Sequence, residues 1–493
     1  MNKKFLKVLF SMAFLLLLGK GLGFIRTAMV ASTYGAGFVS DIYAFEDSFI
    51  NEIYTIFSTF LACSFIPKYL SLNENGKNKL FSLLLNWGTI IMVALMCMAF
   101  IFTEPLLKIL VPGFFNIYDI TKIIFVTRIN LIMLLLTFWV NYTMTILQAH
   151  EIFVYLSLES VILNIIVIIY LLFLSNYGIL GLLLCRVFAY LLLLFLIVIR
   201  LRHLKTLKYT TTINPFDSDL IEMIKLSLPM LLITILWQVN YIIDKSMASR
   251  LSSGSIACLN YANTISMIIY NVVGYIISTY AYPLISKVQD EVDQVKLIFK
   301  EYFFILLQLV LPIAILTMFY SDYVSDFLYG RGNMLQESIK IISKVLVLYI
   351  PGSVAFCIKN LYSKLFYIKK NTKIVLCLDV LGCIVNIILN LIFIRIFGVY
   401  GLALATSFSY VVTVLFQMIF SNRKCYTDIR FKDCGRLAFS VVIIIVVATV
   451  SKWIMINYIY RPLPQFVFVG SIYIISCALC SYKDLKKCVS KTK

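Results

Sequence analysis

Long, nearly continuous apolar segments alternate with short polar connections along the whole chain. A helix needs about 20 predominantly apolar residues to cross the hydrocarbon core of a bilayer. The apolar runs do not alternate with polar positions, which excludes a transmembrane β-barrel. We therefore predict an all-α polytopic membrane protein. About fourteen transmembrane helices are expected, at residues 5–33, 40–66, 80–103, 121–149, 152–174, 179–199, 221–248, 256–284, 297–320, 338–363, 374–397, 400–420, 437–457 and 464–482.

The composition excludes a water-soluble globule. Of the 493 residues, 61% are hydrophobic and 14% are charged, and the mean hydropathy is +0.94. Soluble domains average about 45–50% apolar and about 25% charged residues. The connections between the predicted helices are short, so the chain has no room for a large domain outside the membrane.

The formal net charge of +19 indicates membrane orientation rather than a nucleic-acid partner. Cytoplasmic loops of membrane proteins collect Lys and Arg, and here these residues gather in alternate connections and in the tail. The asymmetry predicts an even number of spans, both termini in the cytoplasm and a location in the plasma membrane. The 12 Cys are scattered, mostly inside apolar segments, and there are two His, so we expect no metal site.

Two pairs of segments resemble each other at an offset of about 220 residues. Residues 35–68 match 253–287, and residues 161–186 match 383–406. The repeat predicts two pseudo-symmetric six-helix lobes that share one orientation, as in transporters whose substrates bind between the halves. The expected division is an N-lobe at 1–202, a basic cytoplasmic linker at 203–217, a C-lobe at 218–421, and two further helices with a basic tail at 422–493.

Charged residues inside the first predicted helices are the most informative feature, because an ionisable side chain in hydrocarbon is costly unless it has partners. The first helix carries Lys20 and Arg26, and the second begins near Asp41. A cavity lined by such cations suits a phosphate or diphosphate group, and Arg128 and Arg186 of the same half would add to it. The alternative is structural: Lys20 reaches the membrane surface and Arg26 pairs with Asp41.

The second half offers a candidate cation site. Asp244 is the best single candidate, and Asn386, Asn390 and Thr406 would add the oxygen ligands that a hard cation such as Na⁺ requires. Spacing alone does not bring these four residues together. We find no Gly-rich phosphate loop, no HExxH and no GxSxG, so an enzyme is not expected.

The motifs GKGLGFIR, YGAGFVSDIYAF and FIPKYL near the N-terminus resemble the MurJ/MviN family of lipid II flippases, within the multidrug/oligosaccharidyl-lipid/polysaccharide exporter superfamily. VPGF at 111–114, the segment 227–263 and FLYGRGNM at 327–334 are similar to the family as well, and the resemblance covers about residues 5–421. It implies fourteen helices, cytoplasmic termini and alternating access for an undecaprenyl-diphosphate-linked precursor.

The resemblance also implies roles for particular residues. Arg26 matches one of the family's essential cavity arginines, Asp41 matches an acidic residue, and Lys20 stands where the family usually has Arg. Two further family arginines are missing, since they fall near Ile53–Tyr54 and at Thr264. In the implied sodium site the matching residues are Asp244, Asn386 and Thr406, while Asn390 stands where an acid occurs in some members.

The leading hypothesis is therefore a flippase that moves lipid II across the cytoplasmic membrane of a bacterium. A flippase for a capsular or O-antigen-type repeat unit stays open, because of the missing arginines, and so does a cation-coupled drug exporter of the same superfamily. The expected partners are an undecaprenyl-diphosphate-linked saccharide, membrane lipids and cell-wall synthesis proteins. We expect a monomer without a cofactor other than Na⁺ or H⁺ as coupling ion.

Overall fold

The computed structural model describes residues 3–204, 209–211, 214, 217–429, 435–458 and 471. All regular structure in these ranges is helical, which confirms the all-α prediction. Eleven helical runs in the described part are long and apolar enough to cross a membrane. The predicted spans 5–33 and 437–457 also correspond to helices, whereas 464–482 lies, apart from Ser471, outside the described residues.

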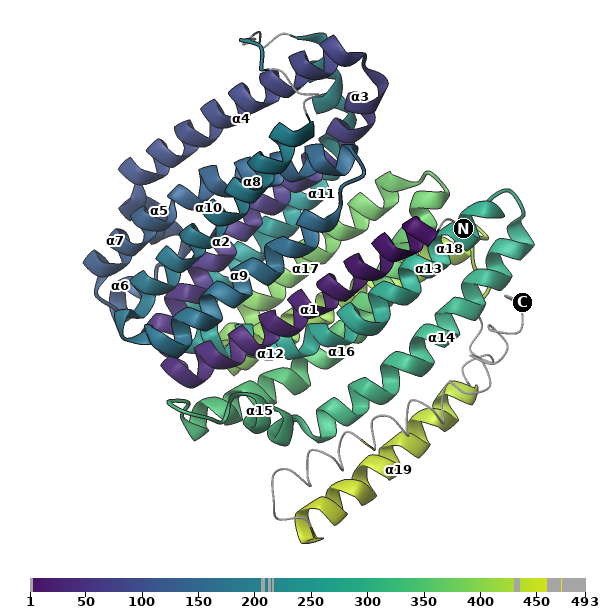
Figure 1. The fold of residues 1–493 in the computed structure, drawn as a ribbon. Coiled ribbons are helices and arrows are strands. Elements are labelled where there is room, and N and C mark those ends of the chain that lie inside the picture. Colours follow the sequence, from purple (N-terminus) through teal and green to yellow (C-terminus); the bar gives the residue numbers. More distant parts are fainter. Residues whose placement is uncertain are drawn as a thin grey trace. The chain divides into compact units, whose positions relative to one another are not determined.

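The described helices pack as two compact units, Met1–Ala257 with Gly332–Met334 and Cys258–Arg331 with Leu335–Lys493. Figure 1 labels the elements. The helices that lie in the first unit are α1 (Lys3–Tyr34), α2 (Phe38–Phe60), the π-helical η1 (Leu61–Phe65), α3 (Ile66–Ser71), α4 (Glu74–Ile101), α5 (Thr103–Leu110), α6 (Phe114–Ile117), α7 (Ile120–Asn130), α8 (Ile132–Ala149), α9 (Val154–Phe173), the 3₁₀ turn η2 (Ser175–Tyr177), α10 (Gly178–Leu204) and α11 (Ser218–Ser249).

The second unit begins within α12 (Ser255–Ile269). It continues through the π-helical η3 (Tyr270–Gly274), α13 (Tyr275–Lys287), α14 (Val292–Phe319), α15 (Ser321–Tyr329), α16 (Gln336–Ile368), α17 (Thr372–Phe397), α18 (Val399–Arg423) and α19 (Gly435–Tyr458).

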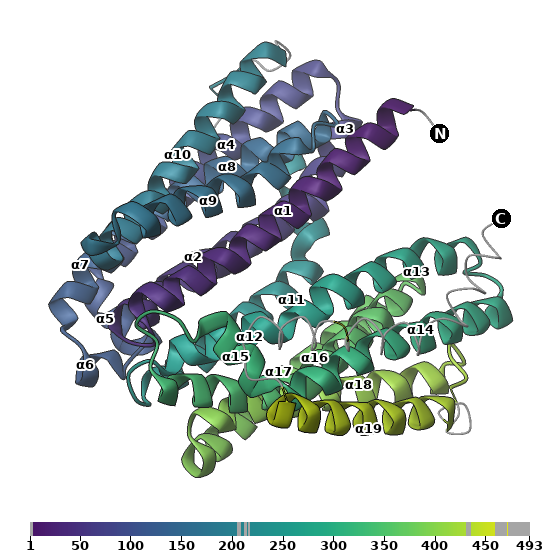
Figure 2. The same cartoon turned by 60° about the horizontal axis from the view of Figure 1, so that its bottom comes forward.

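Aromatic and aliphatic side chains of α2, α4, α8 and α10 form the core of the first unit. Phe138 and Tyr142 of α8 stack with their ring centroids 5.9 Å apart, and the Tyr142 hydroxyl donates to the carbonyl of Phe81 on α4 at 2.8 Å. On another side of this unit α1 packs along α9 (Figure 2), where the Asn164 amide donates to the carbonyl of Gly19 at 3.0 Å.

In the second unit α18 packs against both α16 and α17, and α19 lies along α14 (Figure 1). Polar contacts fix this last pair. The Tyr320 hydroxyl donates to Ser451 Oγ at 2.7 Å, and Lys452 Nζ donates to the carbonyl of Phe319 at 2.7 Å. The first of the two helices beyond the expected lobes is therefore held to this unit by hydrogen bonds as well as by apolar packing.

Helix α11 packs with the first unit, although the repeat assigns it to the C-lobe at 218–421. Ion pairs account for this packing at one end of the helix: Lys68 Nζ lies 2.8 Å from Asp219, and Lys79 Nζ lies 2.5 Å from Asp217. Burial opposes ionisation of Asp217, but hydrogen bonds from Lys79 and backbone amides outweigh it and lower its pKa. A repeat boundary and a packing boundary are different properties, so the repeat-based division stays a prediction.

The matching segments have matching backbone geometry. Gly178 (φ +60°) begins α10 and Gly398 (φ +58°) precedes α18, about 220 residues later. A side chain at such a φ is strained, so glycine suits both turns. The paired runs from α2 to α3 and from α12 to α13 each contain a π-helical turn, a local irregularity that often occurs at functional sites.

Gly88 lets α4 approach α8 closely, because a Cβ at this position would overlap the ring of Phe138. That ring is 5% exposed and is held by Tyr142 and Phe57, so it has little room to move. We expect Gly88→Ala to destabilise the protein by about 1–3 kcal/mol, seen as a lower thermal unfolding temperature in detergent. Gly21→Ala is the matched control, since a Cβ there meets no atom within 4 Å; equal unfolding temperatures for the two variants would contradict the packing argument.

Candidate functional site

Helix α2 places four acidic side chains among its neighbours. Asp41, Glu46 and Glu52 are 2%, 0% and 7% exposed, and Asp47 is partly buried. Uncompensated carboxylates in such positions would cost several kcal/mol each. The structure gives each of the four its own partner, and these partners define the candidate site.

Asp47 forms an ion pair with Arg186 of α10, whose Nη2 lies 2.8 Å from Asp47 Oδ1. Arg186 is 1% exposed, and its guanidinium lies 6.0 Å from the centre of the Tyr43 ring. Its Nε and Nη1 atoms are buried and have no hydrogen-bond partner among the described residues. Of the three guanidinium nitrogens of Arg186, only Nη2 therefore has a partner among the described residues.

Arg26 of α1 lies near the same pair. Its charge acts on both Tyr43 and Asp47, the two residues that Arg186 also reaches. Within the described part of the chain Arg26 forms no ion pair, and its Nε is buried without a hydrogen-bond partner. We call Arg26, Asp47 and Arg186 the arginine cluster. Buried donors without partners are rare in proteins, and an anion is the group that would satisfy them.

Lys245 of α11 adds a third cation. Its Nζ lies 3.1 Å from Glu52 Oε1, and its charge also acts on Asp47. Three cations from three helices thus surround two carboxylates of α2. The unbalanced positive charge is that of Arg26, which lacks an ion-pair partner among the described residues.

Asp41 does not form the ion pair with Arg26 that the structural alternative described. Its carboxylate accepts hydrogen bonds from the backbone N–H groups of Gly254 and Ala257 at 2.7 and 2.8 Å, and from the Tyr118 hydroxyl at 2.8 Å. The carboxylate therefore caps the start of α12, where backbone donors are unsatisfied. Burial and the neighbouring Asp41 charge raise the pKa of Tyr118, which keeps its hydroxyl protonated as a donor.

Glu46 is held by neutral donors from α7. Thr127 Oγ1 donates to Oε1 at 2.5 Å, and Asn130 Nδ2 donates to Oε2 at 2.6 Å. In the same unit Glu159 accepts from the hydroxyls of Tyr190 at 3.0 Å and Tyr54 at 3.4 Å. These carboxylates tie helices together without a direct ion pair among the described residues.

Arg128 and Lys20 are both exposed. The Arg128 guanidinium stacks 4.8 Å from the centre of the Phe100 ring, and its Nε donates to Thr103 at 3.5 Å. Neither cation is part of the arginine cluster as defined above. Their part in substrate binding stays a prediction, as does that of Arg26, Asp41 and Arg186.

The predicted cation ligands fall into two groups. Asn390 donates to Asn386 at 2.9 Å, Asn386 donates to Thr406 at 3.4 Å, and these three belong to the second unit. Asp244 belongs to the first unit, so a common site stays a prediction. Sequence reasoning did not pair Lys359 with Asp379, which form a buried ion pair at 2.9 Å in the second unit.

Comparison with known proteins identifies the family. The family model described as lipid II flippase MurJ matches residues 30–472. The chain belongs to the MurJ family. Two relatives are described as probable lipid II flippase MurJ. The protein from Buchnera aphidicola is 25% identical over 90% of this chain and 88% of its own length. The protein from Rickettsia prowazekii is 23% identical over 95% of each chain.

Solved structures agree in fold with this assignment. A lipid II flippase MurJ in an inward closed conformation aligns with a TM-score of 0.82 at 22% identity, over 96% of this chain and 99% of that one. An inward-facing multidrug resistance transporter of the MATE family aligns with a TM-score of 0.70 at 12% identity, over 82% of this chain and 94% of that one. The fold that the sequence motifs implied is therefore confirmed.

The ion pair between Arg186 and Asp47 generates a stability prediction. We expect Arg186→Gln to destabilise the protein by about 3 kcal/mol or more, because it leaves Asp47 without its direct ion-pair partner. The double variant Arg186→Gln with Asp47→Asn removes both charges and should recover most of the loss. Thermal unfolding of the purified variants measures this, and a double variant no more stable than the single one would contradict the pairing.

The capping role of Asp41 predicts a graded effect. Asp41→Ala removes the acceptor for two backbone donors, so we expect a loss of about 1–2 kcal/mol and faster hydrogen exchange at Gly254 and Ala257. Tyr118→Phe removes only the hydroxyl donor and should leave both amides protected. Hydrogen exchange with mass spectrometry distinguishes the two; unchanged exchange in Asp41→Ala would refute the cap.

Proposed function

We propose that this protein is a lipid II flippase, which moves the undecaprenyl-diphosphate-linked peptidoglycan precursor across the cytoplasmic membrane of a bacterium by alternating access. Membership of the MurJ family supports this proposal, and so does the description of its relatives as probable lipid II flippases. The polytopic helical fold suits a protein that works within a bilayer. The predicted cytoplasmic position of both termini belongs to the same proposal.

The observation that carries the proposal is the set of unused guanidinium donors in the arginine cluster. Arg26 offers Nε and Arg186 offers Nε and Nη1, all buried. Planar guanidinium groups bind phosphate oxygens by paired hydrogen bonds. In this proposal Arg26, which has no ion-pair partner in the described structure, holds the diphosphate, while Asp47 keeps Arg186 in position.

Lys20 extends the same interpretation along α1. It lies six residues before Arg26, or about 9 Å along a helix. This is farther than the two phosphates of one diphosphate are apart, so it suits a sugar substituent farther along the cargo. As an ammonium group Lys20 attracts anions without the planar fork of Arg. A drug exporter would instead need an apolar or acidic substrate site, whereas the arginine cluster combines two cations with one carboxylate.

Charge reversal at Arg26 tests the proposal. In cells depleted of their own lipid II flippase, we expect the unmodified protein to restore growth and Arg26→Glu to abolish the rescue, because a carboxylate repels the diphosphate. Arg26→Lys should retain partial function, since it keeps the charge and loses the fork. Colony formation on depletion medium measures the rescue.

The controls separate transport from folding. Lys122→Glu changes a 72% exposed lysine on α7 and should rescue as well as the unmodified protein, and membrane levels of every variant are measured by immunoblot. Normal rescue by Arg26→Glu would refute the role of the arginine cluster. Failure of the unmodified protein at normal membrane levels would instead refute lipid II as the cargo.

A further inference from the structure

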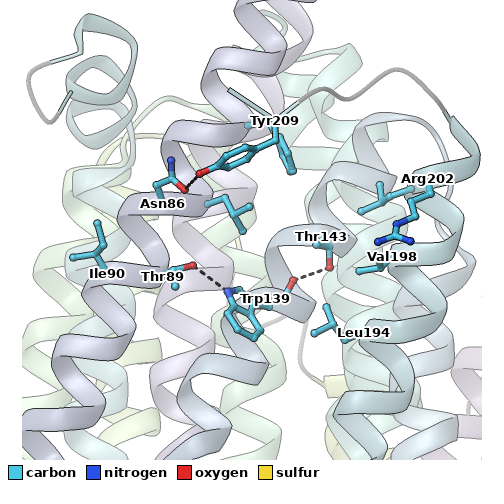
Figure 3. Close-up of a pocket in the computed structure, with 12 residues that line it drawn as sticks. Asn86, Thr89, Ile90, Trp139, Thr143, Leu194, Val198, Arg202 and Tyr209 are labelled. Atoms are coloured by element: carbon cyan, nitrogen blue, oxygen red, sulfur yellow. Dashed lines mark hydrogen bonds between the residues drawn. The ribbon is translucent and has the colours of Figure 1, made fainter. Parts of the chain in front are cut away.

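The first unit contains a second candidate binding site, away from the arginine cluster. It is a pocket of about 820 Å³ between α4, α8 and α10, shown in Figure 3. Its size lies within the range of about 300–1,000 Å³ that is usual for small-molecule sites. The residues that line it are Phe81, Leu85, Asn86, Thr89, Ile90, Trp139, Thr143, Leu194, Val198, Leu201, Arg202 and Tyr209.

Most of the polar groups in this pocket are already satisfied by one another. The Tyr209 hydroxyl donates to Asn86 Oδ1 at 2.9 Å, and Trp139 Nε1 donates to Thr89 Oγ1 at 3.0 Å (Figure 3). Thr143 Oγ1 donates to the carbonyl of Trp139 within α8. These bonds hold the indole ring as part of the wall, so the polar residues fix the shape of the pocket.

Arg202 is the charged exception. It lies two residues before the end of α10, it is exposed, and no described carboxylate forms an ion pair with it. None of the twelve lining residues is acidic. Figure 3 shows its guanidinium on the α10 side of the pocket. The pocket therefore combines one cation at its rim with an apolar interior, which fits an anion that carries a hydrocarbon chain.

The dimensions and surroundings indicate a lipid rather than a soluble anion. Leu194 and Arg202 are eight residues apart on α10, or about 12 Å, which is close to the roughly 15 Å thickness of one hydrocarbon leaflet. Ile90 of the lining and Phe195, which follows the lining residue Leu194 in α10, are 46% and 62% exposed, as expected for side chains that face acyl chains. Arg202 then lies at the depth of the phosphate groups.

We propose that this pocket binds a phospholipid with an anionic headgroup from the leaflet that faces the end of α10. The phosphate contacts Arg202, and one acyl chain lies against Leu194, Val198 and the Trp139 ring. The site does not depend on the proposed transport function, because it shares no residue with the arginine cluster.

Trp139 supplies a reporter for the test. The full-length protein is reconstituted in phosphatidylcholine nanodiscs that contain increasing fractions of phosphatidylglycerol with brominated acyl chains, which quench tryptophan fluorescence on contact. The Trp139→Phe variant, measured in parallel, isolates the contribution of this residue. We expect saturable quenching of Trp139 by brominated phosphatidylglycerol at low mole fraction, and weaker, non-saturating quenching by brominated phosphatidylcholine.

Two variants probe the headgroup and chain contacts separately. Arg202→Gln should weaken the apparent affinity for phosphatidylglycerol about tenfold, the usual effect of losing one charge-assisted hydrogen bond. Arg200→Gln is the matched control at the same helix end, since Arg200 does not line the pocket, and should leave the affinity unchanged. Val198→Phe fills the apolar part and should abolish saturable quenching while Arg202 stays in place.

Each other outcome overturns the proposal. Equal quenching by the two brominated lipids means ordinary boundary lipid. Loss of the signal on adding millimolar inorganic phosphate means a soluble anion. Equal effects of Arg202→Gln and Arg200→Gln mean a diffuse surface charge. Thermal unfolding of each variant establishes that it is folded before it is scored.

Discussion

A guanidinium group enclosed by helices of a membrane protein needs a partner, because removing its charge from water costs several kcal/mol even after relaxation. Arg186 meets this requirement through Asp47, and the consequence extends beyond the pair. The carboxylate that neutralises Arg186 also attracts Arg26 of α1 and Lys245 of α11. Three helices from distant parts of the sequence are thereby held around one position on α2. The Arg186–Asp47 ion pair thus determines where the positive charges of Arg26 and Lys245 lie in the first unit.

Helix α2 works as the scaffold of the first unit because its acidic residues point to different neighbours. Glu46 is held by α7, Asp47 by α10, Glu52 by α11, and Asp41 by the start of α12. Neutral donors hold Asp41 and Glu46, whereas cations pair with Asp47 and Glu52. Rigid placement matters for a transporter, since lobes that rock as bodies need internal contacts that survive the motion.

The hydrophobic pattern sufficed to predict the helices, because spans of about 20 apolar residues have few alternatives in a bilayer. The charged residues within the predicted spans also singled out Arg26 and Arg186 as costly in a membrane. The pattern could not assign partners, since the Asp47–Arg186 contact joins residues far apart in the sequence, and an i, i+4 rule says nothing about neighbours on other helices. The alternative in which Arg26 pairs with Asp41 rested on their proximity in sequence, whereas Asp41 satisfies backbone donors more than 200 residues away.

Arg186 and Arg26 differ in whether a carboxylate already pairs with them, and this difference determines which of the two an incoming anion would contact first. Both carry buried donors without partners, but Arg186 is anchored by a carboxylate and Arg26 is not, in the part of the chain that the structure describes. An anion that approached the pair would have to compete with Asp47 for Arg186, while Arg26 would gain its first direct ionic contact. Because the gain is greatest where no partner has to be displaced, the proposed function assigns the first contact of an incoming diphosphate to Arg26 of α1. The neighbouring ion pair would keep α2 and α10 in place during that contact.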